Sequence, residues 1–130
     1  MKELIEDWFK KAIYFKKNAK QAKENKLYDV VCFSAHQAVE LLLKGIIENN
    51  GGGASPFTHS LIELHEEIIT LNLRKFPEEI VKCLEILTKF YIDGKYPDSC
   101  TEEEALNALN CMEEVFKYTN RFLLENKNTE

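Results

Sequence analysis

The sequence predicts an all-α protein, an up-and-down bundle of four long helices and one shorter helix. Apolar residues recur at spacings of three and four in five separate segments, which is the period of an amphipathic helix. No segment alternates apolar and polar residues for long enough to predict a strand. At 130 residues the chain has the length of one domain. We place that domain at residues 1–126, followed by a tail at 127–130 that should fray.

The first segment predicts a long amphipathic helix. Its apolar side consists of Leu4, Trp8, Ala12, Phe15, Ala19 and Ala22. The small alanines would let another helix approach closely. A short turn at Asn25 and Lys26 separates this helix from the next one, and so few linking residues favour an antiparallel hairpin.

The second segment, from Tyr28 to Asn49, predicts the central helix of the bundle. Its polar side chains fall in one band about 120° wide, which Phe33 and Ile47 interrupt. The band consists of Asp29, His36, Gln37, Glu40, Lys44 and Glu48. The remaining circumference is apolar, so we expect other helices to cover it on more than one side. Glu40 and Lys44 would each cost roughly 2.5 to 3.5 kcal/mol near the centre of a bilayer, which predicts no membrane association.

Turn and capping signals define the third helix. Glycines at 51–53 end the central helix in a flexible loop, because glycine adopts left-handed backbone angles without a side-chain clash. Thr58 or Ser60 can then cap the third helix, with Glu63 completing a capping box with Ser60. The apolar stripe of that helix is Leu61, Leu64, Ile68 and Leu71.

Similar signals define the last two helices. Pro77 suits the first position of a fourth helix, which Gly94 closes. Its apolar residues are Ile80, Leu84, Leu87 and Tyr91. Thr101 with Glu104 forms a second capping box, at the start of a fifth helix. The apolar side of the fifth helix is Leu106, Leu109, Met112, Phe116, Thr119 and Leu123.

Charge is divided unevenly along the chain. Residues 1–27 hold eight lysines and four acidic residues, whereas the remainder holds nine basic and eighteen acidic residues. The basic first helix is either a solvated lysine surface or a docking site for an acidic partner or a nucleic-acid backbone. The acidic remainder, together with the lack of arginine before Arg74, argues against a dedicated nucleic-acid binder.

The cysteines predict a reduced protein. Cys32, Cys83, Cys100 and Cys111 show none of the close pairing of a zinc site or a redox dithiol, and no signal peptide precedes them. We therefore expect free thiols in a cytoplasmic protein. Cys32 and Cys83 fall in apolar helical runs, where cysteine behaves as a small hydrophobe.

Three motifs in order give the chain a family resemblance. They are FSAHQAVELLLKG at 33–45, THSLIEL at 58–64 and YIDGKYPD at 91–98. Together they resemble the HEPN domain family (higher eukaryotes and prokaryotes nucleotide-binding domain) over nearly the whole chain. His36 stands where the family commonly has the first of two glutamines, while Gln37, Glu40 and Lys44 match. Lys95 replaces an arginine, and it keeps the charge without the planar fork of donors.

The resemblance implies a helical bundle that usually dimerises. Such domains are often encoded beside, or fused to, a small nucleotidyltransferase, and they resemble the helical half of aminoglycoside nucleotidyltransferases. Nucleotide binding was proposed for the family on that basis. The resemblance therefore implies a homodimer, a small nucleotidyltransferase as the protein partner, and a nucleotide as a candidate ligand.

Another branch of the family consists of metal-independent ribonucleases that act as toxins and antiviral effectors. Their signature is an arginine followed four to six residues later by a histidine. Here the last histidine, His65, precedes the first arginine, Arg74, and no lysine stands four to six residues before any histidine. Without that cation nothing would stabilise a pentacoordinate phosphate, so the sequence argues against ribonuclease activity and predicts no catalytic residue.

The candidate ligand-binding residues are polar positions within the three motifs: Gln37, Glu40, Lys44, His59, Lys95, Tyr96 and Asp98. Glu40 and Lys44 are spaced for a helical ion pair, which is an alternative to a binding role. His59 lies at a helix start that favours anions, although capping and packing explain it equally well. We interpret His36 as a packed, hydrogen-bonded histidine. We predict no metal site and no cofactor, because no histidine and carboxylate set forms a known metal motif.

Two classes of function stay open on the sequence. The first is a non-catalytic binding and assembly module that dimerises and works with a small nucleotidyltransferase. The second is an enzyme, a divergent ribonuclease or the toxin component of a toxin–antitoxin pair. A further hypothesis is that Lys95 and Tyr96 face one cleft together with Glu40 or Lys44.

Overall fold

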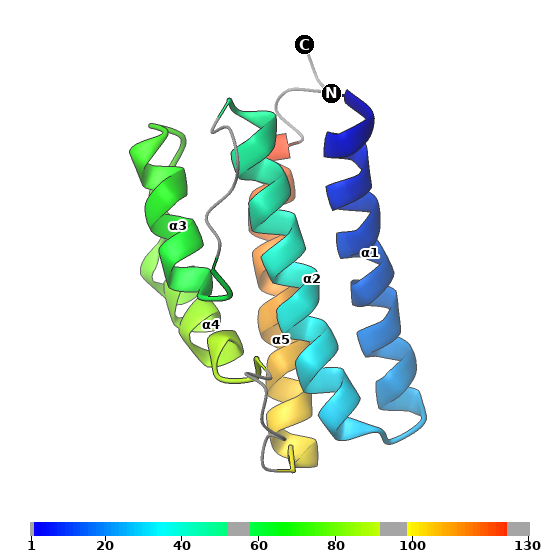
Figure 1. The fold of residues 1–130 in the computed structure, drawn as a ribbon. Coiled ribbons are helices and arrows are strands. Elements are labelled where there is room, and N and C mark those ends of the chain that lie inside the picture. The colour runs from blue at the N-terminus through cyan, green and yellow to red at the C-terminus, as the bar shows by residue number, and fades with distance from the viewer. Residues whose placement is uncertain (1, 52–57, 92–98, 125–130) are drawn as a thin grey trace.

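The computed structural model describes residues 2–51, 58–91 and 99–124. Within these ranges every regular element is helical, which confirms the predicted all-α bundle (Figure 1). The elements in chain order are α1 (Lys2–Glu24), α2 (Tyr28–Asn49), α3 (Leu61–Thr70), α4 (Glu78–Thr88), α5 (Glu102–Thr119) and a π-helical turn η1 (Asn120–Leu124). The domain boundary predicted at residue 126 and the tail after it lie outside the described residues.

Helices α1 and α2 form the predicted antiparallel hairpin (Figure 1). Lys26 adopts a left-handed φ of 59° in the turn, and the Leu27 N–H donates to the Ala22 carbonyl oxygen at 2.9 Å. Ala12 and Ala19 are fully buried, so the two helices pack closely. At Gly45 a Cβ atom would lie only 2.8 Å from Cε1 of Phe9, so a larger residue would force Phe9 to shift.

Helix α2 occupies the centre of the bundle. It packs against α1, α3, α4 and α5, which confirms that its apolar circumference is covered on more than one side. Figure 1 shows α1 on one side of α2 and α3 and α4 on the other, with α5 behind α2. The helix has the length and composition of a membrane span, but 72% of its most apolar window is buried inside the bundle, as in the core helix of a globular protein.

Helices α3 and α4 are the short pair, so the five helices divide into three long and two short rather than four and one. Ser60 caps α3 by accepting a hydrogen bond from the Glu63 N–H. Pro77 is the N-cap of α4 rather than its first helical residue, and α4 ends at Thr88, well before the predicted stop at Gly94. The helix ends early because the next two residues, Lys89 and Phe90, donate their N–H groups to carbonyls three residues back.

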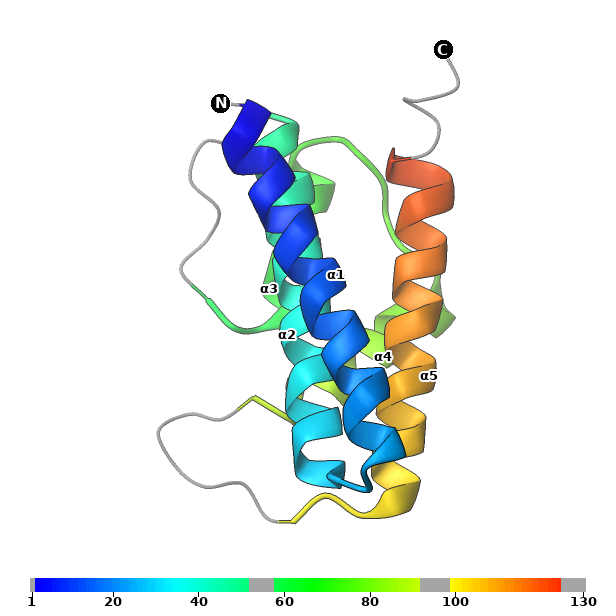
Figure 2. The ribbon, with the colours of Figure 1, turned by 90° about the vertical axis from the view of Figure 1, so that its right-hand side faces the viewer.

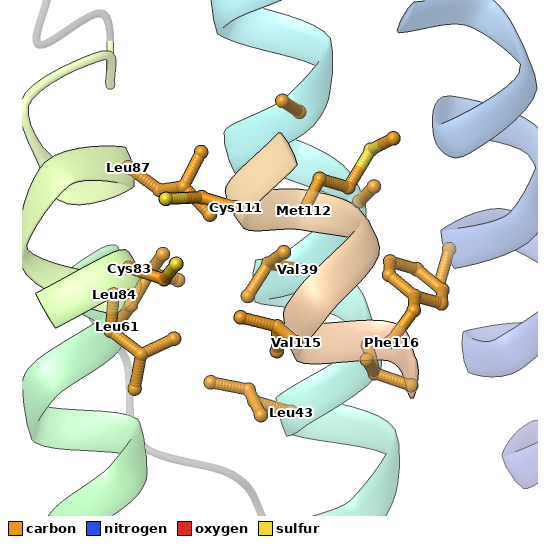
Figure 3. Packing of buried hydrophobic residues seen from close by; sticks show 14 of the residues in the cluster. Val39, Leu43, Leu61, Cys83, Leu84, Leu87, Cys111, Met112, Val115 and Phe116 are labelled. Atoms are coloured by element: carbon orange, nitrogen blue, oxygen red, sulfur yellow. The ribbon is translucent and has the colours of Figure 1, made fainter. Parts of the chain in front are cut away.

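Helix α5 begins with the predicted capping box, in which Thr101 and Glu104 satisfy each other's backbone N–H groups. The predicted apolar side is only partly correct, because Leu106 is 44% exposed. Ala105 and Ala108 are fully buried in its place. Further along α5, Met112, Val115 and Phe116 pack with side chains from α2, α3 and α4 in the core (Figure 3).

The prediction of four reduced cysteines is wrong for two of them. Cys32, in the second turn of α2, is bonded to Cys100, just before α5, across 68 positions of sequence. Sequence spacing could not reveal this pair, because the fold brings together residues that are distant in the chain. Cys83 and Cys111 are free and buried, and burial raises the pKa of the Cys111 thiol to about 12. They are core side chains, as Figure 3 shows.

Candidate functional site

A charged cluster is built around Glu40, in the middle of α2. Glu40 is 4% exposed, and its carboxylate accepts a hydrogen bond from Lys44 Nζ at 3.0 Å, one helical turn later. The same carboxylate contacts Nδ1 of His59, at 3.1 Å for Oε1 and 3.2 Å for Oε2. The ion pair of Glu40 with Lys44, expected from their spacing, is therefore present. A buried carboxylate needs such partners, because its desolvation is otherwise unfavourable.

His36 lies one turn before Glu40 and is fully buried. Since its Nε2 lies 3.0 Å from the His59 carbonyl oxygen, which can only accept, Nε2 carries the proton in the neutral ring. Nδ1 is then an acceptor, and it has no hydrogen-bond partner among the described residues. It lies 3.8 Å from Oε1 of Glu40. Burial lowers the pKa of His36 below its ordinary value of 6.5, although the backbone hydrogen bond and Glu40 oppose this shift.

Tyr91, which follows α4, joins the two histidine rings. Its ring is stacked nearly parallel to His36, with centroids 5.6 Å apart and an interplanar angle of 10°. Its ring centroid lies 3.9 Å from that of His59. Our candidate residues did not include Tyr91, although it opens the third sequence motif. We refer to His36, Glu40, Lys44, His59 and Tyr91 as the Glu40 cluster.

The structure brings three of the predicted site residues together, namely Glu40, Lys44 and His59. Gln37 is partly exposed on α2, beside His36 in the chain. Lys95, Tyr96 and Asp98 lie outside the described residues, and so does the cleft in which Lys95 and Tyr96 were expected to meet Glu40 or Lys44. Tyr91, the last described residue before that segment, contacts His59.

The helix-start position of His59 does not make it a cap, because Ser60 is the N-cap of α3. The His59 side chain is 46% exposed, whereas that of Lys44 is 13% exposed. Glu40 fixes the imidazole through Nδ1, which leaves Nε2 as the second functional atom of the ring. In the neutral ring Nε2 can accept a proton, and in the charged ring it can donate a hydrogen bond to a phosphate oxygen.

The described side chains contain no group of three histidine, cysteine or acidic residues arranged to hold a metal ion. The cluster instead combines one carboxylate with an ammonium group and an imidazole. Such donors suit an anionic oxygen ligand, with the carboxylate holding both donors in place.

Comparison with known proteins identifies close structural relatives. The HEPN domain family matches residues 5–122. The crystal structure of ST0689, an archaeal HEPN homologue, has a TM-score of 0.71 at 26% identity, over 89% of this chain and 94% of that one. The crystal structure of TT1696 from Thermus thermophilus has a TM-score of 0.74 at 27% identity, over 92% of this chain and 98% of that one. No curated protein matches.

Proposed function

The chain belongs to the HEPN domain family, and from this membership we propose that it is a binding and assembly module. In this proposal the protein forms a homodimer and works with a small nucleotidyltransferase. The Glu40 cluster contacts a phosphate group of the nucleotide that the partner uses. The module performs no chemistry alone.

The observation that carries this proposal is the construction of the Glu40 cluster. Lys44 and His59 come from different elements, yet both contact one carboxylate that is 4% exposed. An exposed ion pair one helical turn apart would stabilise α2 by only about 0.2 to 0.5 kcal/mol. Such a pair needs no histidine, so it does not explain the contact of His59 with the same carboxylate. Two donors fixed on a buried carboxylate, one of them reaching solvent, are suited to an anion that arrives from outside.

The homodimer has support at one end of the bundle. Leu27 and Val30 are 52% and 40% exposed and lie three residues apart at the start of α2. A contact surface at this end would bury both side chains. In a two-fold dimer the same patch serves both subunits, so a small apolar patch can be covered by its own copy.

The second candidate function, a divergent ribonuclease or toxin component, has support from one contact. Glu40 orients His59 through Nδ1, as a carboxylate orients a histidine that transfers protons. Against it, every histidine in the sequence precedes every arginine, so the arginine and histidine pairing of the family's ribonucleases is missing. We therefore prefer the binding module.

Co-expression tests the proposal. The chain would be produced together with a candidate small nucleotidyltransferase, and the product would be analysed by size-exclusion chromatography with light scattering. We expect two copies of this chain in one complex with the partner. A monomer at micromolar concentration that does not retain the partner would contradict the proposal. Degradation of RNA by the purified chain without metal would favour the second candidate.

A further inference from the structure

The outer side of α1 carries an apolar pair between two lysines. At about 100° per residue, Lys10, Ile13, Tyr14 and Lys17 fall within an arc of about 100° that faces away from the buried alanines. Tyr14 is 74% exposed and Ile13 is 42% exposed, and both lysines are exposed. Neither lysine forms an ion pair with the described side chains. Tyr14 is the most exposed large apolar side chain among the described residues.

Ile13 also borders a groove that continues the apolar surface toward α5. The groove has a volume of about 420 Å³, and Phe9, Leu42 and Phe116 contribute apolar side chains to it. Figure 2 shows α5 beside α1, with α2 partly behind α1. The acidic residue in the groove, Glu113, is already matched by Lys20 at 2.9 Å and Lys16 at 3.9 Å. The face therefore presents an apolar centre between lysines, with one exposed acidic residue, Asp7, beside Lys10 and Tyr14.

We propose that this face of α1 binds an acidic surface of the protein partner. We call it the α1 docking face and define it as Lys10, Ile13, Tyr14, Lys17 and the adjoining groove. The inference rests on the proposed function, and it identifies where the nucleotidyltransferase would bind. Tyrosine is enriched among the residues that dominate binding energy, and surrounding charges set the choice of partner and the rate of association. The occupant should carry carboxylates around an apolar contact.

Two other occupants fit this face less well. A second copy of the chain would place Lys10 and Lys17 against the same lysines in a two-fold contact, and like charges would repel. A single-stranded nucleic acid could stack on Tyr14. Beyond this face, however, its phosphates would meet mostly acidic side chains, because the sequence outside residues 1–27 holds eighteen acidic and nine basic residues. A compact acidic protein surface avoids both problems.

The test measures the affinity of the co-expressed nucleotidyltransferase for charge-reversed variants of the full chain. Lys10→Glu with Lys17→Glu should weaken binding by about tenfold or more, and Tyr14→Ser should do the same through the apolar centre. The matched control is Lys75→Glu with Lys89→Glu, which changes the net charge equally at two exposed lysines outside α1 that form no ion pair with the described side chains. Thermal unfolding of each variant checks that the bundle remains folded.

The outcomes separate the two proposals. Weaker binding of the α1 variants with an unchanged control, and loss of wild-type affinity as salt rises, would support the α1 docking face. A wild-type complex that all variants form equally well would overturn this inference and leave the proposed function standing. Failure of the wild-type chain to bind would overturn both. Displacement of the partner by poly(U) RNA that depends on Lys10 and Lys17 would assign the face to nucleic acid and overturn the inference.

Discussion

At the scale of single residues, Glu40 organises the site. Its carboxylate joins α2 to the start of α3 through His59 and to the next turn of α2 through Lys44. The close spacing of Glu40 and Lys44 made their contact predictable from the sequence. The contact with His59, 19 positions away, needed the fold, because only the packing of α3 on α2 brings the residue before α3 to the middle of α2.

The first prediction concerns the charge of Glu40. Glu40→Gln keeps the shape of the side chain but removes the charge that both donors share, so we expect the free energy of unfolding to fall by about 1 to 3 kcal/mol. Urea unfolding measures this change. Glu85→Gln, at an exposed position of α4, is the control and should change stability little. Equal stability of the two variants would mean that Glu40 does not hold the cluster together.

The second prediction concerns the buried histidines. Burial lowers the pKa of both His36 and His65 below the ordinary value of 6.5. Nε2 of His65 also accepts the Phe76 N–H at 2.9 Å, a bond that a protonated nitrogen could not accept. The unfolded chain therefore binds protons more readily than the folded chain below pH 6.5. Stability should be fully present above that pH and fall as the pH decreases toward the folded pKa values.

Thermal unfolding between about pH 7.5 and pH 5 measures this dependence. His65→Gln keeps an acceptor near Phe76 and removes one titrating group, so its melting temperature should change less over the same range. A wild-type protein whose stability is constant or rises as the pH falls through 6.5 would contradict the assignment of neutral, buried rings. The solvent-exposed His59 is left unchanged in this comparison.

At the scale of elements, the packing of α1 on α2 depends on small residues. Ala12, Ala19 and Ala22 are buried on α1, and Gly45 meets Phe9 and Trp8 from the α2 side. The sequence predicted the alanine stripe directly from its spacing. The sequence also places Gly45 inside a long apolar helix, where glycine is unfavourable by about 1 kcal/mol relative to alanine. The structure gives the reason for this glycine, which is the close approach of α1.

The third prediction is that Gly45→Ala destabilises the protein despite its better helix propensity. The added Cβ would lie 2.8 Å from Phe9 Cε1 and 3.0 Å from Trp8 Cβ, and the latter atom is fixed to the backbone of α1. Overpacking costs about 1 to 3 kcal/mol, which exceeds the gain in propensity, so we expect a net loss of about 1 kcal/mol. Urea unfolding measures it, and an alanine variant more stable than the wild type would contradict this close contact.

Elements that depend on tertiary contacts were predicted less well than those with local signals. The caps at Ser60 and Thr101 and the five helices follow from nearby residues, and the structure contains them. The end of α4 and the exposure of Leu106 do not follow from nearby residues. Helical spacing of apolar residues shows which positions can be buried. The neighbouring helices decide which positions are buried, and on α5 Ala105 and Ala108 are buried in place of Leu106.

At the scale of the whole molecule, one covalent bond ties the start of α2 to the start of α5. The disulfide between Cys32 and Cys100 spans 68 positions and encloses α3, α4 and most of α2. Beside it, the Cys100 N–H donates a hydrogen bond to the Asp29 carboxylate. Both contacts hold the beginning of α5 against α2. The segment that contains Lys95, Tyr96 and Asp98 lies within the enclosed loop.

The fourth prediction is that reduction destabilises the fold. A bond closing a loop of this length restricts the unfolded chain, so its loss should lower the free energy of unfolding by about 2 to 4 kcal/mol. Urea unfolding with and without dithiothreitol measures this change. Cys32→Ser with Cys100→Ser is the control, and its stability should not respond to the reductant. A wild-type protein that is equally insensitive would show that the bond does not contribute to stability.

The family membership and the all-helical fold account for the architecture, while the proposed function depends on how the Glu40 cluster meets a partner's nucleotide. Calorimetric titration of a nucleoside triphosphate into the co-purified complex tests that claim most directly. With Lys44→Met and His59→Gln combined in this chain, we expect the affinity to fall by about tenfold or more, whereas Lys82→Met should leave it unchanged. Equal affinity in the wild-type and doubly substituted complexes would contradict phosphate binding by the Glu40 cluster.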